Sequence, residues 1–228
     1  MFPYRRNDGH PCLEQNLLIS QSKHLYLTKG GNLRYQDKPI DPRLPGAKTL
    51  LTRLVLLDVD TGTVYGEMHT DDTAGDLVGF LARAWHPKPH HPLHGLPALL
   101  NLPKSGMANP GFRSEIAMVE DVFGVALGDL PPGFNAGIHA VKNFEKEVIS
   151  LAHQYRWKFN VTDVPIDCVQ AHSEIISRIA SSRMSLLFDE AWSAVPQIAP
   201  EVFASVDALY KSHGAWRGWP FSRMFSEG

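Results

Sequence analysis

Acidic side chains in two parts of the chain have the chemistry to bind a divalent metal ion. Asp58 and Asp60 follow an apolar run, and Glu145 and Glu147 lie in a later segment with helical spacing. Two carboxylates at positions i and i+2 of a strand face the same side of a sheet. Magnesium and manganese prefer oxygen ligands of this kind. If the sheet begins at Leu54, we expect the metal ligands to be Asp58, Asp60 and Glu145, with Glu147 as the alternative glutamate.

A structural role is the other interpretation of the two aspartates. The sequence Asp60-Thr61-Gly62 suits a hairpin turn. An Asp side chain readily bonds to the backbone two residues on, and Gly adopts positive φ without penalty. We favour the turn for this pair.

Four histidines crowd one short segment, at positions 86, 90, 91 and 94. Imidazole is a common zinc ligand, but a structural zinc site needs four ligands, and no nearby cysteine completes a known spacing. Three prolines between Trp85 and Gly95 exclude a regular element. We predict a proline-rich surface loop here.

The hydrophobic patterns predict strands and helices in alternation. Short strands are expected in a β-rich opening section and then in three later runs, over residues 13–20, 24–28, 33–36, 50–57, 63–69 and 98–102. Helices are expected from Thr70 or Asp71 through Ala84, and over 114–123, 138–155, 170–192 and 200–212. The helix over 170–192 should turn Ile175, Ile176, Ile179 and Leu186 towards the core. Residues 128–136 are expected to form a flexible loop.

Several motifs occur in a particular order between residues 50 and 157. An apolar strand ends in Asp58-Val59-Asp60-Thr61-Gly62, a second strand covers 64–69, and Asp72-Thr73-Ala74-x-x-Leu77 opens a helix. Gly95-Leu96-Pro97 leads into Leu99-Leu100-Asn101-x-x-x-x-Gly106, Phe112 follows, and a helix surrounds residues 142–148. This block resembles the catalytic core of retroviral-type integrases and DDE transposases. The resemblance implies an α/β fold with a ribonuclease-H-like mixed sheet flanked by helices.

The resemblance also implies where metal-binding carboxylates should stand. Such enzymes hold two divalent ions, Mg²⁺ or Mn²⁺, between an Asp on the opening strand, a second Asp after the Gly-x-Pro strand, and a Glu that begins the long helix. Asn101 stands at the second position, and Asn16 at the first if residues 13–20 open the sheet. One alignment puts Lys142 at the Glu position. Because an amide cannot neutralise a dication, we favour a degenerate core without a metal cofactor.

Charge is unevenly distributed along the chain, whose net charge is −2. Residues 1–57 carry nine Lys/Arg against four Asp/Glu, residues 58–150 six against twelve, and residues 151–228 seven against eight. DNA binding needs concentrated positive charge. The candidate nucleic-acid contacts are Lys104, Arg113, Lys142 and Lys146, and the aromatic, basic segment 216–225 is a candidate for stacking or docking.

Composition narrows the class of protein. The chain has 228 residues, of which 43% are hydrophobic, and no apolar run of membrane-spanning length. Cys12 and Cys168 are too few for a disulfide framework, so we expect buried thiols in a cytoplasmic protein. Serine-hydrolase and phosphate-loop motifs do not occur. We expect a β-rich section over 1–48, a core over 49–160, and a helical C-terminal extension over 161–228.

The sequence therefore predicts a non-catalytic, integrase-core-like protein of a mobile element that binds DNA or a recombination partner. An active metal-dependent recombinase or nuclease is the first alternative, and a protein-binding module, which could form a homo-oligomer, is the second. No membrane partner is expected.

Overall fold

A mixed sheet forms the centre of the protein. The computed structural model describes residues 10–41, 46, 48–70, 77–107, 110–131, 135–184 and 189–198. Within these ranges the sheet has seven strands: β1 (Glu14–Leu27), β2 (Asn32–Tyr35), β3 (Thr49–Asp58), β4 (Val64–His69), β5 (Leu99–Leu102), β6 (Ala126–Asp129) and β7 (Val164–Pro165).

The long strand β1 organises this sheet. On one side it pairs antiparallel with β3, which in turn pairs antiparallel with β4. On the other side, the beginning of β1 pairs in parallel with β5, and β6 adds in parallel beyond it. The end of β1 pairs antiparallel with β2, which reaches β7. Parallel and antiparallel strands thus meet at the beginning of β1.

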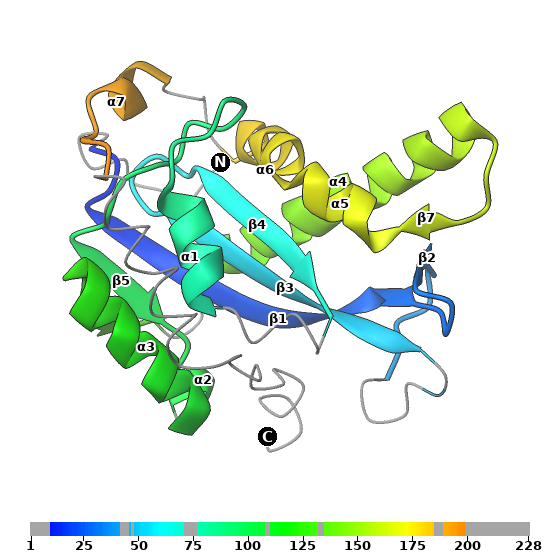
Figure 1. Cartoon of the computed structure of the whole chain (residues 1–228), viewed down its shortest axis with the longest axis horizontal. Helices are drawn as coiled ribbons and strands as arrows, with labels where there is room; N and C mark the ends of the chain where they lie inside the picture. Colours follow the sequence, from blue (N-terminus) through cyan, green and yellow to red (C-terminus); the bar gives the residue numbers. More distant parts are fainter. Residues whose placement is uncertain are drawn as a thin grey trace.

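Helices cover both faces of the sheet. The helices are α1 (Leu77–Trp85), α2 (Lys104–Met107), α3 (Pro110–Phe123), α4 (Asn135–Phe159), α5 (Ile166–Ala171), α6 (Ser173–Ser182) and α7 (Asp189–Ser193). One hydrophobic core joins α1, α3 and Trp192 of α7 to the sheet, and the other joins α4, α5 and α6 to its opposite face. Figure 1 shows the central strands between α1 and α4. Strand β3 is almost wholly buried because both of its faces are covered.

The outer edge of β4 is closed by side chains of α6 rather than by another strand. Ser181 Oγ accepts a hydrogen bond from Val64 N at 2.8 Å and donates one to Val64 O at 3.0 Å. One turn earlier, Ser177 Oγ accepts from Gly66 N at 2.9 Å. An open strand edge is a template for aggregation, and these serines satisfy its polar groups.

The structure confirms the α/β class and the strands expected at 50–57, 63–69 and 98–102. It also confirms the buried face of the helix that contains Leu77, Phe80, Leu81 and Ala84. The helix expected at 114–123 begins earlier, at Pro110, and the long helix begins at Asn135. The expected start of a helix near Asp71, the position of Leu186, the helix at 200–212 and the tail at 216–225 lie outside the described residues.

Three expectations about the elements are wrong. The strands at 13–20 and 24–28 form one strand, because a shift in register between Gln21 and Tyr26 lets β1 continue past an irregularity. The loop expected at 128–136 contains part of β6, whose pairing with β5 overrides the turn-forming sequence. The helix expected over 170–192 is divided into parts. Ile175 and Ile179 are 44% and 43% exposed, because serines and Ile176 occupy the buried face of α6.

All three segments expected as separate sections contribute strands to the sheet. Strands β1 and β2 come from residues 1–48, β3 to β6 from 49–160, and β7 from 161–228. In the part of the chain that the structure describes, no helix is both long and apolar enough to cross a membrane.

Candidate functional site

Two asparagines meet where β1 and β5 lie side by side. Asn16 and Asn101 are register partners in this parallel pair. Asn101 Nδ2 donates a hydrogen bond to Asn16 Oδ1 at 2.8 Å, and both residues are buried. The two strands thus hold two neutral amides against each other at the boundary between the parallel and antiparallel parts of the sheet.

Within the described residues, Glu14 supplies the carboxylate that contacts this pair. Its Oε1 accepts a hydrogen bond from Asn101 Nδ2 at 2.5 Å. On the other side, Gly128 of β6 is the register partner of Asn101 and leaves room for the amide, because a Cβ at position 128 would collide with Asn101 Oδ1. The resemblance to integrase cores pointed to Asn101 and Asn16, whereas Glu14 was missed. Its position two residues before Asn16 on a strand was the available signal.

Asp58 faces away from the asparagine pair. It is the register partner of Gln15, whereas Asn16 is the partner of Leu57. Cross-strand partners share a face of the sheet and neighbours along a strand alternate, so Asp58 and Asn16 lie on opposite faces. Leu57 packs in the core with α4, which places the two amides on the α4 face.

Asp58 has a structural role at the turn between β3 and β4. Its Oδ1 accepts hydrogen bonds from Thr61 N at 2.9 Å and Thr61 Oγ1 at 2.7 Å, and its Oδ2 accepts one from Cys12 N at 2.9 Å. Burial raises the pKa of Asp58, and these hydrogen bonds oppose the shift. Asp60 lies in the turn, beyond the end of β3, so the two aspartates do not form an i, i+2 pair on one strand.

Glu145 and Glu147 of α4 are each paired with an arginine. Glu145 Oε2 lies 2.6 Å from Arg53 Nη1, and its Oε1 accepts a hydrogen bond from Ser22 Oγ. Glu147 Oε1 lies 2.5 Å from Arg183 Nη2. Burial lowers the pKa of Arg53, and the contact with Glu145 opposes that shift.

The structure does not bring Asp58 and Glu145 together. Arg53, which contacts Glu145, precedes Asp58 by five residues on β3, about 17 Å along a strand. Five residues also place the two side chains on opposite faces. Among the described residues, no group of three or more His, Cys, Asp or Glu side chains is arranged to hold a metal ion.

The candidate nucleic-acid contacts lie on three helices. Lys142 and Lys146 are exposed on α4 and line a cavity of about 620 Å³ with Lys23 of β1. Lys104 of α2 lies 3.6 Å from Asp129 and is largely exposed, and Arg113 is exposed on α3.

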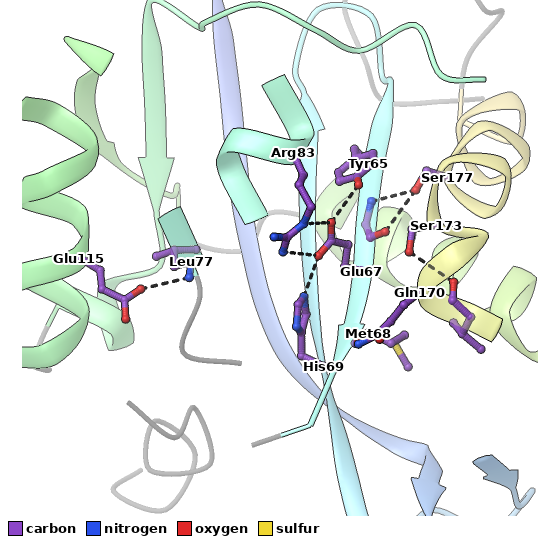
Figure 2. Close-up of polar contacts among 12 residues, drawn as sticks. Tyr65, Glu67, Met68, His69, Leu77, Arg83, Glu115, Gln170, Ser173 and Ser177 are labelled. Atoms are coloured by element: carbon purple, nitrogen blue, oxygen red, sulfur yellow. Dashed lines mark hydrogen bonds and ion pairs between the residues drawn. The ribbon is translucent and has the colours of Figure 1, made fainter. Parts of the chain in front are cut away.

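A buried cluster centred on Glu67 was not predicted. Tyr65 Oη, His69 Nε2 and Arg83 Nε each lie 2.9 Å from a carboxylate oxygen of Glu67, and Figure 2 shows these side chains converging on it. Burial would raise the pKa of Glu67, but the contacts with His69 and Arg83 lower it to about 2. An acidic residue and a histidine at alternate positions of a strand were the available signal. The carboxylate is ionised, and both of its oxygens accept hydrogen bonds from these side chains.

The histidine-rich segment does not form a metal site among the described residues. His91 is buried, accepts a hydrogen bond from Leu93 N through Nδ1, and therefore donates from Nε2 to Val64 O at 2.8 Å. Burial lowers the pKa of His91 to about 3, so the ring is neutral. The expectation of a surface loop is wrong for His91, which packs on the edge of β4. Of the two thiols, Cys12 is buried as expected and burial raises its pKa to about 12, whereas Cys168 is only partly buried.

Comparisons with known proteins assign no family to this chain. No family model matches the chain, and no curated protein matches it either. Among solved structures, the chain is similar to one described as a cryo-electron-microscopy structure of the simian T-cell lymphotropic virus intasome in complex with PP2A regulatory subunit B56 gamma. The TM-score is 0.43, the identity is 15%, and the match covers 86% of this chain and 60% of that chain. A likeness at this TM-score supports no conclusion about fold or activity.

Proposed function

We propose that this chain is a catalytically inactive, integrase-core-like domain with a ribonuclease-H-like fold, and that it acts by binding DNA or a recombination partner. The observation that carries this proposal is the hydrogen bond between Asn16 and Asn101 on adjacent strands. The family resemblance expects a metal-binding carboxylate at each of these two positions.

The order of the strands supports the proposed fold. Strands β1, β3 and β4 form an antiparallel unit, and β5 and β6 then add in parallel on the other side of β1. The long helix α4 follows and packs on the face that carries both asparagines. This is the order of elements that the resemblance leads us to expect.

The chemistry of the side chains supports the proposed loss of activity. Two-metal catalysis needs anionic ligands that neutralise and position both ions. Among the residues that the structure describes, only Glu14 contacts the pair as an anion, and its carboxylate already binds the amide of Asn101. The alternative of an active enzyme would require Asp58 to give up three hydrogen bonds and Glu145 to give up its ion pair with Arg53.

Exposed aromatic residues favour a protein partner as the second candidate function. Trp157 and Phe159, at the end of α4, are 87% and 54% exposed. Aromatic side chains are enriched in the centres of protein interfaces. The end of α4 therefore presents an aromatic surface suited to contact a protein.

Calorimetric titration with Mn²⁺ tests the proposal. We expect no binding to the natural chain at this site, because amides leave a dication unneutralised. The double variant Asn16→Asp with Asn101→Asp would place two new carboxylates beside Glu14, and we expect it to bind Mn²⁺ with a Kd of about 0.1–1 mM, typical of a weak carboxylate site.

The matched control exchanges two asparagines away from the pair, Asn32→Asp and Asn143→Asp, and should not gain a site. Binding of Mn²⁺ by the natural chain that is lost in an Asp58→Asn variant would contradict the proposal and support the active alternative. Mg²⁺-dependent DNA cleavage by the natural chain would do the same.

A further inference from the structure

The cavity beside the asparagine pair has the size of a ligand site. Its volume is about 620 Å³, within the range of pockets that bind small organic molecules. The part of β1 from Leu18 to Ser20 lines it from the sheet, and α4 lines it from the opposite side. Leu18 and Ser20 share a face of β1 with Asn16, so the cavity continues the face that carries the amides.

Most of the cavity lining is apolar. Aliphatic side chains come from the sheet, from the segments after β5 and β6, and from α4: Leu18, Pro103, Leu130, Ile138, Val141 and Ile149. An apolar lining of this extent favours a ligand with an apolar body, because its burial removes both surfaces from water.

The charged groups of the lining are predominantly positive. Lys23, Lys142 and Lys146 line the cavity, and among the described residues none of them forms an ion pair. The acidic residue of the lining, Glu145, is neutralised by Arg53. The cavity therefore favours an anion over a cation or a neutral molecule.

Two buried polar atoms beside the cavity have no hydrogen-bond partner within the described part of the chain. They are Ser20 Oγ and Arg53 Nε. Ser20 and Arg53 are register partners on β1 and β3, so both residues lie on the face of the sheet that borders the cavity. Buried polar groups are nearly always paired, and two neighbouring donors without an acceptor indicate the place of an anionic group.

We propose that this cavity binds a free organic anion with an apolar body, of which a medium-chain carboxylate is the simplest example. The carboxylate accepts hydrogen bonds from Ser20 and Arg53 and is neutralised by Lys142 and Lys146. Its chain lies against the aliphatic residues of β1 and α4. The site shares Arg53 with the ion pair to Glu145, and it shares Lys142 and Lys146 with the candidate DNA contacts. It uses neither asparagine of the pair, so Mn²⁺ titration and decanoate displacement can fail independently of each other.

Displacement of a fluorescent probe tests the proposal. Anilinonaphthalene sulfonate, which has an aromatic body and one negative charge, is bound to the full chain and displaced with decanoate or with decanol. We expect decanoate to displace it about tenfold better than decanol, the difference expected for a charge-assisted contact. The variant Lys142→Gln with Lys146→Gln should remove that preference, and Lys158→Gln, at the far end of α4, should retain it.

Substitutions of residues that line the cavity test whether the ligand binds there. Ile138 is exposed and lines the cavity, so Ile138→Trp should fill it and weaken decanoate binding about tenfold, whereas Ile179→Trp on α6 should not. Ser20→Ala should weaken decanoate but not decanol. Equal displacement by decanoate and decanol, or binding unaffected by Ile138→Trp, would overturn the proposal. So would decanoate binding that appears only when lipid vesicles are present.

Discussion

At the scale of single residues, the most consequential group outside the asparagine pair is Glu67. It is buried, and its two oxygens accept hydrogen bonds from Tyr65, His69 and Arg83. Glu174 also lines the small cavity of about 420 Å³ beside it. The ionised carboxylate is more stable in the folded protein than in water, because its partners outweigh the cost of burial.

Acid should therefore destabilise the protein through Glu67. The pKa of this carboxyl group falls from 4.5 to about 2 on folding. A lowered pKa contributes stability that is present above pH 4.5 and is lost as the pH falls towards 2. The contribution at neutral pH is about 3 kcal/mol as an upper bound, since Arg83 is partly exposed.

Glu67→Gln should lower the free energy of unfolding by about 2–3 kcal/mol at pH 7, measured with urea, since it removes the buried carboxylate that His69 and Arg83 contact. The difference from the natural chain should shrink between pH 4.5 and pH 2. The control is Glu120→Gln, an exposed glutamate of α3. A difference that does not change with pH would show that the carboxylate is not the stabilising group.

At the scale of elements, α6 illustrates how tertiary contacts override hydrophobic spacing. The isoleucines suggested one buried face, but Ile175 and Ile179 are exposed. Besides Ile176, the buried face carries the serines Ser173, Ser177 and Ser181. These residues recur every four positions and lie on one side of the helix. They face β4 because the polar groups of an edge strand need partners that isoleucine cannot provide.

Removing these hydroxyl groups should open the edge of β4. Ser177→Ala with Ser181→Ala should lower the free energy of unfolding by about 1–3 kcal/mol per site, because backbone groups of Val64 and Gly66 lose their partners. Hydrogen exchange measured by NMR should accelerate at these two amides. Ser182→Ala, at an exposed position of the same helix, is the control. Unchanged protection of Val64 would mean that the hydroxyl groups do not hold the edge.

At the scale of the whole molecule, the four candidate cations are spread over the three helices α2, α3 and α4 of a chain whose net charge is −2. Lys104, Arg113, Lys142 and Lys146 are all exposed. DNA binding through them should be weak and strongly dependent on salt, because each phosphate contact releases a counterion.

The binding constant of the chain for a labelled DNA duplex, measured at several salt concentrations, should decide between DNA and protein partners. Replacing all four cations by Gln should weaken retention and reduce the slope of log K against log salt by about three to four. Lys29→Gln with Lys158→Gln, two exposed lysines elsewhere, should change it less. If the natural chain retains no DNA at low salt, the recombination partner is left as the ligand of the proposed function.

The sequence by itself determined the α/β class, the runs that form β3, β4 and β5, and the buried face of α1, because local hydrophobic periodicity specifies such elements. The family resemblance singled out Asn101 and, if residues 13–20 open the sheet, Asn16. Only the tertiary structure decided that these two amides bond to each other, that Asp58 faces the other side of the sheet, and that Lys23 joins Lys142 around one cavity. These outcomes depend on strand register and on contacts between residues far apart in the chain, and a shift of one residue would have reversed each face.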